Sequence, residues 1–280
     1  MINNVLYLGP AGSYSEKAKE CFSTYYSTNC EFIIEDSIYK IIRRLKEVDS
    51  ESYAAVIPIE NSVEGVVRET QDNLWSLAEF GYRILAETKM QIEHSLISFG
   101  QKSEIKVVTS HPQALAQCRD FIYRNWADDI VLQPVLSTSL AVSSLSADNP
   151  TVAAIGNSSC ASLYGVPVLE TSINDEPNNS TRFVLLSKQA PTKADENKIS
   201  IVFSTENKSG ALNKVLGVFE KYDLNLSYID SRPSKKELGE YVFFVDFAGY
   251  IEDSTVAMAL VEIQPYVSAF EILSKGANCV

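Results

Sequence analysis

The sequence predicts an α/β protein in which a large first region is followed by a smaller ferredoxin-like unit. Over residues 1–187, short β-rich runs alternate with amphipathic helical stretches. Residues 188–197 mix charge with proline and lack apolar periodicity, which is typical of a linker. Residues 198–280 follow the order strand, helix, strand, strand, helix, strand of a βαββαβ sandwich. With 280 residues, 45% of them hydrophobic, the chain can bury two or three cores.

The first strands and helices carry their own start signals. A strand over 4–8 leads into the turn GPAGS, and the S-x-x-E spacing of Ser13 and Glu16 predicts a capped helix after it. A strand over Cys30–Glu35 is followed by Ser37, which is expected to cap a second helix. The apolar positions of that helix recur every three or four residues: Ile38, Ile41, Ile42, Leu45 and Val48.

The rest of the chain continues this alternation. In the first region, further strands are expected over 53–60, 83–92, 94–99, 105–110, 131–137, 151–156 and 181–187, with helices from Pro112 and Thr138. In the second unit, strands are expected over 199–205, 224–231, 240–248 and 267–273, with helices over 210–219 and 256–263.

Acidic residues outnumber basic ones, and this balance excludes several classes of partner. Aspartate and glutamate number 36 against 24 lysines and arginines, a net charge of −12, which argues against nucleic acid and against an anionic membrane surface. No apolar run approaches the ~18 residues that span a bilayer, and the start MINNVLYLGP lacks the regions of a secretory signal. Five scattered cysteines without a C-x-x-C pair, and only two histidines, favour free thiols and no metal site. We therefore expect a cytoplasmic protein without a metal or cofactor.

Four polar clusters follow predicted strands, where open α/β sheets bind their ligands. They are 9–15 (GPAGSYS), 60–65 (ENSVEG), 110–117 (SHPQALAQ) and 178–183 (NNSTRF). The first and third lead into helices, whose N-terminal amides can hold a carboxylate without lysine. An acidic chain therefore keeps a local means of binding an anionic ligand.

Each cluster also has a structural explanation when it is taken alone. The glycines of 9–12 suit a tight turn, and Ser110 suits the N-cap of a helix. His94 in an alternating strand is more often a structural residue, and the asparagines at 61 and 178–179 are turn formers. No single cluster decides between a structural and a functional role.

Taken together and in order, the clusters resemble the motifs of the prephenate dehydratase family. The chain has GPAGSYSEKA, IPIENSVEGVVRETQDNL, SHPQALAQC and NNSTRF where the family has GPxGT(F/Y)S, PIENS, SHPQAxxQC and TRF. The second unit resembles the ACT regulatory domain attached to these enzymes, with its two effector motifs present as KSGAL (208–212) and DSRP (230–233). The resemblance covers nearly the whole chain.

The resemblance implies a two-lobed, periplasmic-binding-protein-like catalytic domain followed by an ACT domain. The expected parts are a catalytic domain over 1–187, with a first lobe of about 1–75 and 157–187 and a second lobe of about 76–156, a linker over 188–197, and an ACT domain over 198–280. In the cleft between the lobes, the family expels the ring hydroxyl and ring carboxylate of prephenate together, which gives phenylpyruvate, carbon dioxide and water. Two alternatives stay open: an arogenate dehydratase, and a non-catalytic cytosolic sensor of a small molecule.

The resemblance also assigns roles to residues of the clusters. Thr181 is the leading catalytic residue, as a donor to the departing hydroxyl, and Asn61 and Gln117 are uncharged groups that orient the substrate. The residues expected to bind the substrate are Ser13, Ser62, Ser110, Arg182, Phe183, Glu60 and His94. For Arg182 a structural ion pair stays open, and for Glu60 and His94 a supporting role stays open.

For the second unit, the resemblance implies a phenylalanine site built by paired ACT domains. The expected effector-binding residues are Asn207, Gly210, Ala211, Leu212, Asp230, Ser231, Arg232 and Pro233. We therefore expect feedback inhibition by L-phenylalanine and a homodimer or homotetramer. The chain departs from the family at Asp230, which replaces a glutamate, and at Ser13, which replaces a threonine.

Overall fold

The computed structural model describes residues 1–127, 129–189, 197–234, 240–276 and 278–279. The strands are β1 (Ile2–Leu8), β2 (Tyr26–Glu35), β3 (Tyr53–Asn61), β4 (Gly65–Val66), β5 (Arg83–Gln91), β6 (Ser95–Ile97), β7 (Val107–Ser110), β8 (Val131–Pro134), β9 (Val152–Gly156), β10 (Val168–Glu170), β11 (Ser180–Ser187), β12 (Ile199–Ser204), β13 (Leu226–Pro233), β14 (Tyr241–Phe247), β15 (Ala269–Lys275) and β16 (Asn278–Cys279). The α-helices are α1 (Tyr14–Cys21), α2 (Ile38–Val48), α3 (Arg68–Glu79), α4 (Pro112–Gln117), α5 (Arg119–Trp126), α6 (Thr138–Ser143), α7 (Ser158–Tyr164), α8 (Ala211–Lys221) and α9 (Ser254–Glu262). Short 3₁₀ turns lie at Ser23–Tyr25, Lys102–Glu104 and Gln264–Tyr266.

The first lobe is built on the sheet β16-β5-β11-β3-β1-β2, with β4 paired to β3. Strand β1 runs parallel to β2 and β3, whereas β11 runs antiparallel to β3 and β5. Because successive side chains of a strand point to opposite faces, the sheet has two apolar faces to cover. Helix α1 covers one face around Tyr7 and Phe22, and α2 and α3 cover the other around Leu45 and Leu77.

Helix α2 forms as its sequence predicts. The Ser37 hydroxyl accepts a hydrogen bond from the amide of Lys40 at 3.3 Å and so caps the helix. Its periodic residues from Ile38 to Leu45 form the buried face. The box predicted at α1 forms only in part, because Ser13 accepts from the Glu16 amide while the Glu16 carboxylate accepts from the amide of Gly12 at 2.6 Å.

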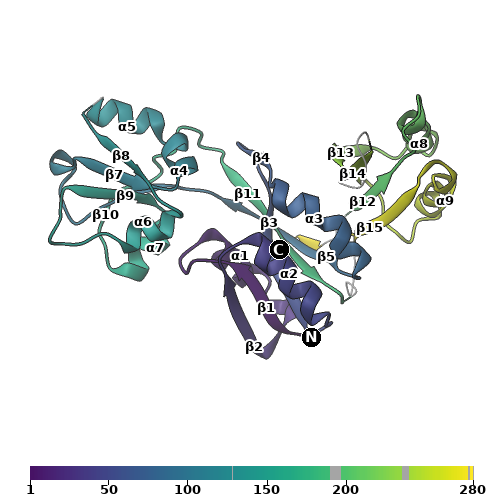
Figure 1. Cartoon of the computed structure of the whole chain (residues 1–280), viewed down its shortest axis with the longest axis horizontal. Helices are drawn as coiled ribbons and strands as arrows, with labels where there is room; N and C mark the ends of the chain where they lie inside the picture. Colours follow the sequence, from purple (N-terminus) through teal and green to yellow (C-terminus); the bar gives the residue numbers. More distant parts are fainter. Residues whose placement is uncertain (128, 190–196, 235–239, 277, 280) are drawn as a thin grey trace.

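The second lobe is built on the sheet β10-β6-β9-β7-β8, with helices α4 to α7 around it. Two segments, 92–94 and 171–179, connect the lobes (Figure 1). They are hydrogen-bonded to each other: the amide of Ile92 donates to the carbonyl of Asn179 at 2.8 Å, and the amide of Ile173 donates to the carbonyl of His94 at 2.9 Å. The two crossings therefore form one paired connection beside the junction of the lobes.

The observed lobes differ from the predicted residue limits. Residues 76–91 were assigned to the second lobe, but β5 pairs with β11 along its length in the first sheet. Residues 157–170 were assigned to the first lobe, but β10 pairs with β6 in the second sheet. Within the described residues, the chain changes lobes at the two crossings, because antiparallel pairing in each sheet continues up to them.

Strands β12 to β15 and helices α8 and α9 form the expected βαββαβ unit, with strand order β13-β14-β12-β15. Helices α8 and α9 cover one face of its sheet. Its other face packs on the first lobe, because Val242, Phe244 and Leu273 share one apolar core with α2 and α3. The unit lies on the side of the first lobe away from the second lobe (Figure 1).

Two further observations concern the limits of this unit. Most of the predicted linker, residues 190–196, lies outside the described residues. Asn278 and Cys279, which were expected within the second unit, instead pair with β5 of the first lobe. Within the part of the chain that the structure describes, no helix is both long and apolar enough to cross a membrane.

Candidate active site

Asn61 and Thr181 face each other across neighbouring strands at the junction of the lobes. In the register of β3 and β11, Thr181 pairs with Asn61 and Arg182 with Glu60. The next pair is Phe183 with Pro58, so one residue of β3 is extra, and the strand has a β-bulge there. The bulge shifts the alternation of β3, which places Asn61 on the same face as Thr181.

A chain of side-chain hydrogen bonds leads from Thr181 to the second lobe. The Asn61 Nδ2 donates to the Thr181 hydroxyl at 2.9 Å and to Asn179 Oδ1 at 2.7 Å. The Asn179 Nδ2 donates to Gln117 Oε1 at 3.0 Å, and Gln117 Nε2 donates to the Glu64 carboxylate at 3.2 Å. We call Asn61, Asn179 and Gln117 the amide chain. Because Gln117 belongs to α4, this chain bridges the two lobes.

The direction of every hydrogen bond in the amide chain is set by two backbone amides. The N–H groups of Val63 and Glu64 donate to Asn61 Oδ1 at 3.0 and 2.9 Å, so the Asn61 NH₂ must point to Thr181 and Asn179. The Thr181 oxygen is thereby an acceptor for Asn61. Among the described residues its hydroxyl hydrogen meets no acceptor, and it stays available for donation to a ligand.

His94 contacts Gln117, the last residue of the amide chain. Its Nε2 lies 3.0 Å from Gln117 Oε1, which already accepts from Asn179, so Nε2 carries the hydrogen and donates. His94 is 4% exposed, and its Nδ1 is buried without a partner in the described part of the chain. Burial lowers the pKa of His94 from 6.5, and the Gln117 hydrogen bond opposes this shift only in part. The imidazole is therefore neutral at neutral pH.

The burial of His94 predicts that the free energy of unfolding decreases as the pH is lowered through the mildly acidic range. Below pH 6.5 the unfolded chain binds a proton on this imidazole while the folded chain does not, so the free energy of unfolding decreases as pH falls towards the lowered pKa. The slope approaches about 1.4 kcal/mol per pH unit for one proton. The urea midpoint of the wild type is expected to fall between pH 6.5 and 5 more steeply than that of His94→Asn. Equal slopes for the two proteins would contradict a buried neutral His94.

The three serines predicted to bind the substrate donate their hydroxyl hydrogens to backbone carbonyls instead. The hydroxyl of Ser13 donates to the Leu8 carbonyl at 3.1 Å, that of Ser62 to the Asn178 carbonyl at 3.0 Å, and that of Ser110 to the Ile155 carbonyl at 2.6 Å. A carboxylate needs donors, and in this arrangement these hydroxyl hydrogens are already engaged. The helix after Ser110 is instead capped by His111, whose Nδ1 accepts from the Gln113 amide.

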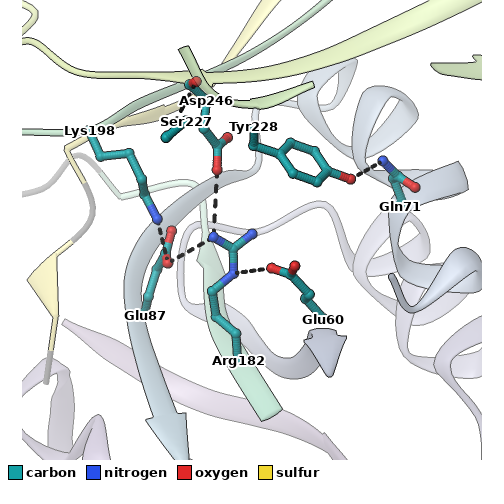
Figure 2. A network of polar contacts seen from close by, with 8 residues as sticks. All are labelled: Glu60, Gln71, Glu87, Arg182, Lys198, Ser227, Tyr228 and Asp246. Carbon is teal, nitrogen blue, oxygen red and sulfur yellow. Dashed lines mark hydrogen bonds and ion pairs between the residues drawn. The ribbon is translucent and has the colours of Figure 1, made fainter. Parts of the chain in front are cut away.

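Arg182 and Phe183 also differ from the substrate-binding role predicted for them. Arg182 follows Thr181 in β11 and therefore points to the opposite face, where it meets Glu60, Glu87 and Asp246 (Figure 2). This is the ion-pair alternative, and Glu60 belongs to the same cluster. Phe183 is 3% exposed and packs in the core beside α1. Neither side chain joins the amide chain.

Sequence reasoning missed Asn179 and Glu64 as site residues. Asn179 is 1% exposed and links Asn61 to Gln117. Its surrounding sequence is equally typical of a turn, so it was not singled out. Glu64 receives the hydrogen bond of Gln117 across the lobes. The signal was present, because both residues lie within the ENSVEG and NNSTRF clusters, but nothing in the sequence distinguished them from their neighbours.

The two effector motifs lie at the same end of the sheet β13-β14-β12-β15 but line different cavities. Asn207, Gly210, Ala211 and Leu212 line one cavity with Tyr241 and Phe243. Gly210 has φ +79° at the N-cap of α8, a conformation that favours glycine. Arg232 and Pro233 line another cavity, between this sheet and α3, where Arg232 binds Asp72 at 2.8 Å. Asp230 accepts from the amide of Ser231 at 2.8 Å.

The protein has two α/β lobes bridged by the amide chain, and a ferredoxin-like unit follows them. This arrangement defines a protein of periplasmic-binding-protein-like fold with a C-terminal ACT domain. The family profile for prephenate dehydratase matches residues 5–191, and that for the ACT domain matches residues 199–263. The chain belongs to the prephenate dehydratase family, whose members are lyases that decarboxylate and dehydrate prephenate.

Individual relatives agree with this assignment. The chain is 41% identical to the prephenate dehydratase of Methanocaldococcus jannaschii over 247 residues, which is 87% of each protein. It matches the crystal structure of prephenate dehydratase from Arthrobacter aurescens in complex with L-Phe with a TM-score of 0.82 and 32% identity, over 97% of this chain and 88% of that one. A structure described as GqqA, a quorum quenching acylase, has a TM-score of 0.80 at 23% identity over 96% of each chain, a likeness that shows the fold alone.

Proposed function

We propose that this chain converts prephenate to phenylpyruvate at the junction of its lobes, with Thr181 as the donor to the departing hydroxyl. The observation that carries the proposal is the direction of the Asn61–Thr181 hydrogen bond, which leaves the Thr181 hydrogen free. Asn61 holds the Thr181 oxygen in place, and Gln117 and His94 reach the same site from the second lobe and the crossing. Each group is a neutral hydrogen-bonding group.

A neutral site suits this reaction. As the ring carboxylate leaves as carbon dioxide, its bonding electrons enter the ring, which becomes aromatic, and the C–O bond breaks with its electron pair on oxygen. Negative charge therefore develops on the departing oxygen, which takes up one proton to become water. A donor aimed at that oxygen stabilises the transition state, whereas a strong cation at the ring carboxylate would stabilise the ground state. Thr181, held by the amide chain, supplies the donor without the cation.

The net charge of −12 does not oppose an anionic substrate at such a site. Glu60, the acidic residue of β3, pairs with Arg182 on the opposite face of the sheet, as do Glu87 of β5 and Asp246 of β14. The site itself carries neutral amides, a hydroxyl and a neutral imidazole, and Glu64 at its edge is held by Gln117. The acidic balance of the whole chain therefore acts at a distance, where salt screens it.

The same proposal includes feedback inhibition by L-phenylalanine in a homodimer or homotetramer, in the cytoplasm. The Arthrobacter aurescens relative was solved with L-Phe, which supports this ligand for the ACT domain. In one chain the two effector motifs line separate cavities, so a second ACT domain is expected to complete the site. A ligand that binds one arrangement of the subunits more tightly than another shifts the population towards it.

Turnover of purified protein tests the proposal. The wild type is incubated at neutral pH with prephenate or with arogenate, and phenylpyruvate and phenylalanine are measured against the spontaneous rates. We expect phenylpyruvate to form far above the spontaneous rate, with a larger kcat/KM for prephenate. A preference for arogenate would make the chain an arogenate dehydratase, and binding of either compound without turnover would make it a sensor.

A further inference from the structure

Arg182 connects the strand that carries Thr181 to the ACT domain. Its Nη1 lies 3.5 Å from the carboxylate of Asp246 in β14 and 3.6 Å from that of Glu87 in β5 (Figure 2). Its Nε lies 3.6 Å from the carboxylate of Glu60. Asp246 is 7% exposed, so this contact lies inside the interface between the first lobe and the ACT domain.

These three carboxylates hold the Arg182 guanidinium in position by ion pairing. Burial alone would lower the pKa of Arg182, but the attraction of Glu87, Asp246 and Glu60 outweighs burial and raises the pKa. Glu87 is shared with Lys198, which donates to it at 2.7 Å. Among the described ion-pair partners of Arg182, Asp246 alone comes from the ACT domain, so a displacement of β14 changes the field around Arg182 directly.

The ion-pair cluster and the proposed catalytic pair are neighbours in the same two strands. Arg182 pairs with Glu60 across the sheet, and the next cross-strand pair is Thr181 with Asn61. One peptide link on each strand therefore separates a pair that faces the ACT domain from a pair that faces the lobe junction. The bulge in β3 makes this arrangement possible, because it turns Glu60 towards Arg182.

We infer that Asp246 is a positioning residue through which the ACT domain acts on Thr181 and Asn61, by way of Arg182. When β14 moves, Arg182 follows the carboxylate of Asp246, and the backbone of β11 carries the displacement to Thr181. The direction in which the Thr181 hydroxyl donates then changes, and with it kcat. The inference rests on the proposed function, because it takes L-phenylalanine as the ligand that moves the ACT domain.

The activity that remains at saturating L-phenylalanine tests this coupling without depending on effector affinity. In Asp246→Asn, the neutral amide keeps the shape but not the charge that holds Arg182. We expect the residual activity of this variant, relative to its own uninhibited rate, to be at least about fivefold that of the wild type, the lower end of ordinary coupling energies. Asp246→Glu keeps the charge and is expected to restore deep inhibition.

The matched control is Glu271→Gln, a change from carboxylate to amide in the same interface. Glu271 pairs with Arg83 at 2.8 Å, away from Thr181, and its loss is expected to leave the depth of inhibition as in the wild type. Deep inhibition of Asp246→Asn, or equal relief in Glu271→Gln, would overturn the inference while the proposed regulation stands. A wild type that L-phenylalanine does not inhibit would instead overturn the proposed regulation, and the inference with it.

Discussion

Replacing Thr181 with valine is expected to lower kcat for prephenate by about 10²–10⁴-fold, the contribution of a well-placed proton donor. Valine keeps the branched shape of threonine in β11 and removes only the hydroxyl. The departing oxygen then loses the donor that the amide chain aims at it. KM is expected to change little, because this hydrogen bond strengthens as charge develops in the transition state.

Thr181→Ser is the matched control, since it restores a hydroxyl at the same position. We expect its kcat to lie within about tenfold of the wild type, because the Asn61 Nδ2 can still orient the oxygen. Single-turnover formation of phenylpyruvate measures the chemical step for all three proteins. A valine variant that is as active as the serine variant would show that Thr181 has no part in the reaction.

Replacing Asn61 with aspartate is expected to lower kcat by about 10²–10³-fold, as removal of a single preorganised donor does. One carboxylate oxygen keeps the bonds from the amides of Val63 and Glu64, but the other presents an acceptor where the NH₂ was. The Thr181 hydroxyl then donates to this carboxylate, and its hydrogen is no longer available to the substrate.

The control for this charge change is Asn149→Asp, on the surface of the second lobe. Asn149 is exposed, and its Oδ1 accepts from the Thr151 hydroxyl at 2.9 Å, a bond that aspartate also accepts. Its kcat is expected to stay within about twofold of the wild type, as for surface changes away from special features. Melting curves for both variants separate lost activity from lost folding, and a fully active Asn61→Asp would contradict the assigned direction of the bond.

Local patterns predicted the longer strands and the best-marked helices, because those signals are local, whereas the short strands β4, β10 and β16 were not predicted. The Ser37 cap and the apolar spacing of α2 are both visible within residues 37–48. Helix α3 was not predicted, since Val67 offers no side-chain cap and the helix begins with the polar run RETQDN. Its formation depends on burying Leu74 and Leu77 against the sheet and the ACT domain, a tertiary effect that a local pattern does not contain.

The motifs predicted which residues form the candidate site, but not how their side chains are arranged. Strict alternation along β3 places Asn61 on the face of Ile57 and Ile59, towards the ACT domain, and only the bulge turns it to Thr181. Register across strands is a long-range property, so the sequence of β3 alone does not show the bulge. For Arg182, in contrast, alternation alone argues against the predicted substrate contact, because a residue next to Thr181 in a strand points to the opposite face.

The most direct test of the account is a double-mutant cycle on Asn61 and Thr181, with kcat for prephenate as the measured quantity. The account holds that Asn61 acts on the reaction by directing the Thr181 hydroxyl, so the two residues work as one unit. We predict that Asn61→Asp combined with Thr181→Val lowers kcat no further than the worse single variant, within about threefold, as for groups that act together. Losses that multiply in the double variant would show two independent contributions and contradict the account.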